Sequence, residues 1–116
     1  MHSIRQPAVA GVFYPGQAAV LSGDVRALLA TAALADVSAH APPKALIVPH
    51  AGYVYSGPTA ALAYARLAPL RAVIRRVVLL GPVHRVPVRG LALPGADVFE
   101  TPLGQIEVDQ QAMASL

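Results

Sequence analysis

The chain has 116 residues, of which 55% are hydrophobic and only 13% are charged. Disordered segments show the reverse balance, so an ordered chain with a buried core is expected. Nine Lys and Arg against six Asp and Glu leave a formal charge of +3. This excess is too small to predict a nucleic-acid-binding protein. Because Cys is absent, disulfides, thiolate metal ligands and Cys nucleophiles are excluded within these residues.

The sequence predicts neither a membrane-spanning segment nor a signal peptide. A weakly charged stretch, residues 31–43, contains Asp36, is rich in Ala and ends in two Pro, and is too broken to cross a bilayer. The first seven residues have no apolar region behind their basic residue. We therefore expect a soluble, cytoplasmic α/β protein that binds no membrane.

The first predicted helix follows a segment without a clear period. Residues 5–14 contain Gly11 and Pro7, which indicates an irregular or short extended segment. Apolar residues then recur at the spacing of one helix face, at Leu21, Val25, Leu28, Leu29 and Ala32. This helix is expected to end before Pro42, because Pro cannot continue a helix.

Two unbroken apolar runs, Lys44–Val48 and Arg76–Leu80, are typical of strands buried on both faces of a parallel sheet. Between them the sequence predicts a loop over His50–Gly57 and an Ala-rich helix over residues 58–67. Pro58 would occupy the first helical position, where Pro is well tolerated. The succession of strand, helix and strand predicts a right-handed βαβ unit.

Three further elements are predicted after residue 80. Gly90–Pro94 resembles a third strand, and Gln105–Val108 a half-buried strand that follows a turn-rich segment. Asp109 is a good N-cap for a last helix, with Val108 and Met113 placed as a hydrophobic staple. A helix so short needs a covering surface, so we expect a fragment of a longer chain. The alternative is a frayed helix that docks on a complete domain.

His50 and His84 each follow one of the two predicted parallel strands. Neighbouring strands lie about 4.8 Å apart and end at the same sheet edge, so two imidazoles there can share a metal ion. The alternative is that each His is a loop residue with a local hydrogen bond. Catalytic metals usually have three protein ligands, and no carboxylate of the chain is an obvious third. His2 and His40 are expected to take no part.

The loop after His50 offers further candidate pocket residues. Tyr53 and Tyr55 carry phenols that could donate hydrogen bonds beside a metal, although core packing is the alternative for each. Ser56 lies where a helix start could favour an anion. No nucleotide-binding glycine pattern is present. A cluster of basic residues, expected to be a solvated face, consists of Arg66, Arg71, Arg75 and Arg76.

Four motifs follow one another along the chain: Gln6–Pro15, Pro49–Gly57, Leu80–His84 and Glu100–Gly104. Together they closely resemble the Memo family, whose prokaryotic members are called AmmeMemoRadiSam system protein B. The resemblance implies an α/β fold in three layers around a parallel sheet, similar to class III extradiol dioxygenases of the LigB type. These dioxygenases use a non-haem Fe(II).

The resemblance also assigns residues. His50 matches the first metal-ligand His, His84 the second and Tyr55 a Tyr of the same pocket. The third ligand and the acid/base His of the relatives lie in a part absent from this chain, so residues 1–116 are expected to be the N-terminal half of one Memo-like domain. Val83 and Arg85 depart from the usual Gly-Pro-Ser-His-His pattern, which changes the hydrogen bonding around His84.

Two functions are compatible with this resemblance. The first is a metal-dependent, dioxygenase-like redox enzyme that acts on an unidentified small molecule with Fe(II) or Cu, for which Zn could substitute. The alternative is a non-catalytic protein that uses the pocket to bind a peptide or to handle metal. A carboxylate as third ligand would favour Fe(II) chemistry, and a Cys would favour copper. The isolated fragment is expected to be inactive, and a homo-oligomer fits either function.

Overall fold

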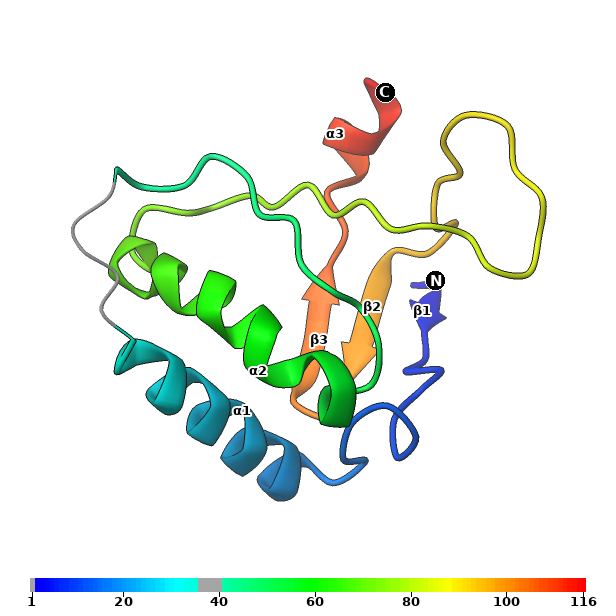
Figure 1. Cartoon of the computed structure of the whole chain (residues 1–116). Helices are drawn as coiled ribbons and strands as arrows, with labels where there is room; N and C mark the ends of the chain where they lie inside the picture. Colours follow the sequence, from blue (N-terminus) through cyan, green and yellow to red (C-terminus); the bar gives the residue numbers. More distant parts are fainter. Residues whose placement is uncertain (1, 36–40) are drawn as a thin grey trace. The chain divides into compact units, whose positions relative to one another are not determined.

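The computed structural model describes residues 2–35 and 41–116, so His40 lies outside the described residues. The chain divides into two compact units (Figure 1). The sheet unit consists of residues 2–7 and Arg76–Leu116, and the helical unit consists of Ala8–Arg75. The described residues form helices and a three-stranded mixed sheet, which confirms the predicted α/β class. None of the described helices combines the length and the hydrophobicity needed to cross a membrane.

The sheet has the strand order β1-β2-β3 and contains β1 (Ile4–Arg5), β2 (Val98–Thr101) and β3 (Gly104–Glu107). β1 pairs in parallel with β2, and β2 pairs antiparallel with β3. The buried side chain of this sheet is Val98. The sheet is therefore mixed, whereas the sequence predicts a parallel one.

Ser3 and Asp97 fasten the short strand β1 to the start of β2. The N–H and the hydroxyl of Ser3 donate to Asp97 Oδ2 at 2.9 and 3.2 Å, and the Asp97 N–H donates to the Ser3 carbonyl at 2.9 Å. The two bonds that Ser3 donates to the carboxylate, first from its backbone N–H and then from its hydroxyl, lower the pKa of the Asp97 carboxyl. Two strand residues alone make few ladder bonds, so this reciprocal pair holds the start of the chain on the sheet.

A tight turn joins β2 to β3. The Thr101 hydroxyl accepts from the Leu103 N–H at 3.1 Å and donates to the Gly104 carbonyl at 3.2 Å. Gly104 has a φ of 136°, which side chains other than hydrogen rarely allow. The predicted strand over Gln105–Val108 is confirmed as β3, shifted by one residue, but all four of its residues are exposed rather than half-buried.

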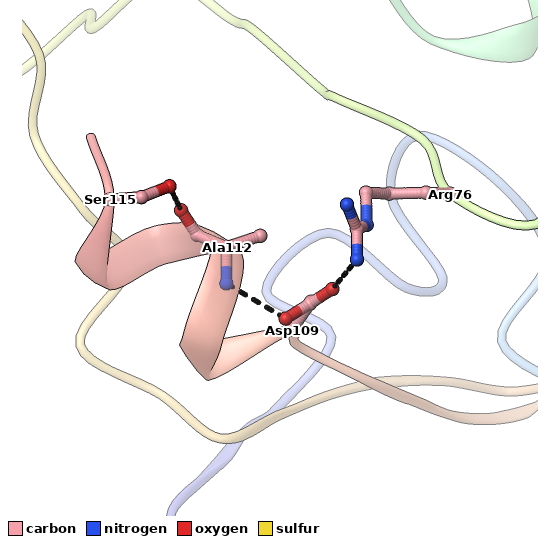
Figure 2. Close-up of polar contacts among 4 residues, drawn as sticks. All are labelled: Arg76, Asp109, Ala112 and Ser115. Atoms are coloured by element: carbon pink, nitrogen blue, oxygen red, sulfur yellow. Dashed lines mark hydrogen bonds and ion pairs between the residues drawn. The ribbon is translucent and has the colours of Figure 1, made fainter.

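The last helix, α3 (Gln110–Ala114), begins at the predicted N-cap. Asp109 Oδ1 accepts from the Ala112 N–H at 2.9 Å, and its Oδ2 pairs with an Arg76 guanidinium nitrogen at 2.7 Å (Figure 2). At the other end, the Ser115 hydroxyl donates to the Ala112 carbonyl at 2.7 Å. The bond from Ala112 first, and the nearby Arg76, lower the pKa of the Asp109 carboxyl. One side chain thus caps α3 and ties it to Arg76.

We expect α3 to unfold in acid. Because the folded pKa of Asp109 is below its ordinary value of 3.8, its contribution is complete above that pH and is lost as the pH falls through the lower folded pKa. The Ala112 amide NMR shift should report this transition. In Asp109→Asn the amide side chain still caps the helix, so the transition should vanish while α3 persists. In Asp109→Ala, α3 should fray at every pH, and an intact helix there would contradict this role.

The helical unit pairs two helices, α1 (Ala18–Ala33) and α2 (Tyr53–Tyr64), which lie side by side in Figure 1. The periodicity of the sequence predicts α1, and its buried residues Leu21 and Ala32 belong to the predicted face. Ala61 and Gly57 are the apolar residues that α2 buries. The core of the helical unit therefore lies at the contact between these two helices.

The second helix begins five residues before its predicted start. Gly52 is the N-cap of α2, and its carbonyl accepts from the N–H groups of Tyr55 and Ser56 at 2.9 and 3.0 Å. This first turn forms without Pro58, which lies inside the helix. The carbonyl that Pro58 leaves without a donor belongs to Val54, which is exposed and can bind water. Pro69 likewise lies inside a 3₁₀ helix, η1 (Ala65–Leu70).

The predicted strands Lys44–Val48, Arg76–Leu80 and Gly90–Pro94 are wrong, because these residues form no strand. A strand requires hydrogen bonds to a neighbour, and the described residues pair none with these runs. The prediction of burial also fails, since Ile47 and Val77–Leu80 are exposed. The expected βαβ unit is consequently not formed by the described chain.

Candidate functional site

His50 lies in the loop that leads into α2, and this loop packs on the segment before α1. The Tyr53 N–H donates to the Phe13 carbonyl at 2.8 Å. Gly52 lies directly on the Phe13 backbone, where a Cβ would already stand 3.5 Å from that carbonyl oxygen. Two of the motifs therefore meet in the helical unit, through Ala8–Pro15 of the first and Pro49–Gly57 of the second, and fix the backbone just after His50.

A tight turn presents Phe13 to this loop. Gly11 has a φ of 80°, and its N–H donates to the Tyr14 carbonyl at 2.7 Å. The N–H groups of Val12 and Phe13 both donate to the Val9 carbonyl. The sequence predicts neither Phe13 nor Tyr14 as a site residue, although both lie in the motif Gln6–Pro15. The signal that could have found them is the aromatic pair between Gly11 and Pro15, two residues typical of turns.

Ser56 holds the His50 loop from the helix side. The residue is only 6% exposed, and its hydroxyl donates to the Ala51 carbonyl at 2.8 Å and lies 3.3 Å from the Gly52 carbonyl. A hydroxyl that is occupied in this way supports the backbone beside His50. Ser56 therefore supports the loop, and its predicted place in the pocket stays a prediction.

The two tyrosines that were predicted as pocket residues have different surroundings. Tyr53 packs against Tyr14, with ring centroids 5.7 Å apart. Burial first, and then Tyr14 and Tyr64, raise the pKa of the Tyr53 phenol. Tyr55 is 83% exposed. Tyr53 is therefore part of an aromatic cluster, whereas the phenol of Tyr55 is open to a ligand.

His84 belongs to the sheet unit, in the segment Gly81–His84, which follows the apolar run before it. Both His50 and His84 are exposed in loops. His50 is in the helical unit, and the structure places each unit separately, so the meeting of the two imidazoles stays a prediction. The nearness of Tyr55 to both stays a prediction for the same reason.

Comparison with known proteins decides the family. The family described as Memo-like protein matches residues 5–116. The chain belongs to the Memo family. It is 38% identical to Protein MEMO1 of Danio rerio over 112 residues and 39% identical to a MEMO1 family protein of Aquifex aeolicus over 106 residues. Protein MEMO1 of Homo sapiens is 35% identical over 112 residues.

The match covers most of this chain but a smaller part of its Memo relatives. It covers 97% of the chain and 36% of the Danio rerio protein, and 91% of the chain and 37% of the Aquifex aeolicus protein. The chain thus spans little more than a third of the length of these relatives. His50 and His84 both lie inside the matched residues.

The donor chemistry of this Memo chain fits part of a metal site. Neutral imidazole is a good ligand for Fe, Cu and Zn, and both His50 and His84 are exposed residues. Within residues 2–35 and 41–116, no group of three or more His, Asp or Glu residues is arranged to hold a metal. That His50 and His84 belong to one ligand set therefore stays a prediction.

Proposed function

We propose that this Memo chain contributes His50 and His84 to a divalent-metal site with redox, dioxygenase-like activity on a small molecule. The observation that carries the proposal is the Memo match over residues 5–116, which includes both His and the loop that holds His50. Fe(II) or Cu is the proposed metal, and the third ligand is proposed to come from outside this chain. When bound, such a metal supplies Lewis acidity and electron transfer to oxygen.

The chain's own residues have distinct tasks in this proposal. The bond from the Tyr53 N–H to the Phe13 carbonyl and the Ser56 hydroxyl bond fix the backbone on which His50 stands. The exposed phenol of Tyr55 offers a hydrogen bond to a substrate oxygen. A rigid support matters because ligand orientation controls how tightly and how selectively a metal is held.

The proposed activity can be tested in a chimera in which this chain replaces the matched stretch of the Aquifex aeolicus relative. We expect the chimera to retain a divalent metal after dialysis and, with Fe(II) added anaerobically, to consume oxygen with a catechol. The isolated chain should bind metal weakly and lose it on dialysis, because affinity depends on ligand number. A chimera that retains no metal would contradict the proposal.

Binding without catalysis is a second candidate function, favoured by the surface at the start of α2. Val54 and Tyr55 are 90% and 83% exposed and follow His50 closely in the chain. Exposed aromatic and aliphatic side chains are typical contacts for a peptide. A chimera that retains metal but turns over no catechol would favour this second function.

A further inference from the structure

A groove of about 490 Å³ lies between α1 and α2, the neighbouring helices of the helical unit (Figure 1). Ala32 lies at its base and is only 4% exposed, whereas Leu62 is 47% exposed and lies at its rim. Leu28 and Pro58 add further apolar surface to the lining. Sites for small molecules usually enclose about 300–1,000 Å³ and are mostly apolar. The groove therefore matches such a site in size and in lining.

The lining of the groove carries one sign of charge. Asp24 is the charged residue among the described lining residues, and Thr31 and Thr59 are the other polar ones. Asp24 is exposed, and no cation among residues 2–35 and 41–116 forms an ion pair with it. A carboxylate without a counter-charge at an apolar surface attracts a positively charged ligand. The groove is therefore expected to prefer a cation to a neutral molecule or an anion.

The charged and the apolar parts of the lining follow each other along α1. Asp24 and Thr31 are seven residues apart, so they lie on one face of the helix, about 10 Å apart along its axis. Ala27 and Leu28 lie between them on that face. A ligand that fits this order has its charge at one end and an apolar body of similar length behind it.

We propose that this groove binds an aliphatic amine, a small molecule that carries a protonated amino group on a hydrocarbon chain. The ammonium pairs with Asp24, and the chain packs along Leu28 and Leu62. Burial of the chain supplies most of the affinity, and the carboxylate selects the charge. None of the lining residues is a proposed metal ligand, so this site stands apart from the proposed metal function.

Titration with three probes that share one chain length tests the proposal: octylamine, octanol and octanoate, each below the concentration at which it forms micelles. Octylamine should bind about 3- to 5-fold more tightly than octanol, which is the gain that an exposed ion pair can give. Octanoate should bind more weakly than either, because its carboxylate repels Asp24. The amide NMR shifts of Thr31 and Thr59 should move with the titration and so locate the amine in the groove.

Two variants separate the charge from the groove. Asp24→Asn should lower the affinity for octylamine to that for octanol, and Ala27→Arg should abolish binding by filling the groove with a cation. Ala30→Arg is the matched control, because Ala30 is an exposed residue of α1 that does not line the groove. It changes the net charge equally and should leave the affinity unchanged.

Circular dichroism checks that each variant keeps its helices, and if Ala27→Arg does not fold, Asp24→Asn decides the question. The proposal is overturned if octylamine does not bind, if its affinity is the same in Asp24→Asn, or if octanoate binds as tightly. Shifts that leave Thr31 and Thr59 unmoved would place the amine elsewhere and overturn it as well.

Discussion

Replacing His50 or His84 by Ala in the chimera is expected to lower the affinity for Fe(II), Cu(II) or Zn(II) by more than about 100-fold. Removing a partner that merely orients a metal ligand already costs roughly 10–100-fold, so removing a ligand costs more. Calorimetric titration and metal content after dialysis would measure the loss. The double variant should bind no better than either single variant, because each change already leaves the ligand set incomplete.

Two other histidines serve as controls for this experiment. His2 and His40 lie outside the motifs that carry the family resemblance, so His2→Ala and His40→Ala should retain the affinity of the chimera. Ser56→Ala gives an intermediate case, because it removes the hydroxyl bond to the Ala51 carbonyl but no ligand. Unchanged affinity in the His50→Ala, His84→Ala double variant would show that the metal is held elsewhere.

Features that depend on neighbours in the sequence were predictable. The apolar spacing of α1 and the N-cap at Asp109 are local patterns, and both are confirmed. The start of α2 was misplaced because Pro58 suggested a first position, while the capping at Gly52 depends on a turn that Phe13 supports. A contact 40 residues away in sequence, between residues 13 and 53, carries no local signature.

Strand pairing was the least predictable part of the fold. β2 has four residues between segments rich in Gly and Pro, and the sequence predicts a turn-rich segment there. Its neighbour β1 lies 94 residues away, counted between Ser3 and Asp97. Conversely, the apolar run Arg76–Leu80 has the composition of a buried strand but no partner strand among the described residues. The composition of a segment shows that it favours the strand conformation. A strand forms only when a neighbouring strand also supplies the hydrogen bonds.

The candidate site was predictable to a different degree at each of its residues. The motifs predict His50 and His84 as metal ligands, and the family that the motifs indicate is confirmed. Motifs could not show that Ser56 is buried and bonded to the Ala51 carbonyl, or that Tyr53 packs on Tyr14, because side-chain surroundings arise from tertiary contacts. The metal site itself stays a prediction, since its ligands lie in two separate units.

The close contact between α1 and α2 supports the last prediction. A Cβ at Gly57 would lie 3.2 Å from Leu28 Cδ1, which is tighter than most contacts. In Gly57→Ala, the Leu28 side chain must move by a few tenths of an ångström. This cost opposes a gain in helix propensity of about 1 kcal/mol, so its net effect should be small.

Gly57→Val adds two further carbons against Leu28 and should lower the free energy of unfolding by about 1–3 kcal/mol, the usual cost of overpacking. Gly23→Val is the matched control, because Gly23 lies in α1, is exposed and has no atom within 4 Å of an added Cβ. Both substitutions change helix propensity equally, so the difference between the two variants in urea unfolding isolates the contact with Leu28. Equal stability of the two variants would mean that α1 and α2 do not pack at Gly57 in solution, and the support beneath the His50 loop would then have to come from Phe13 and Ser56 alone.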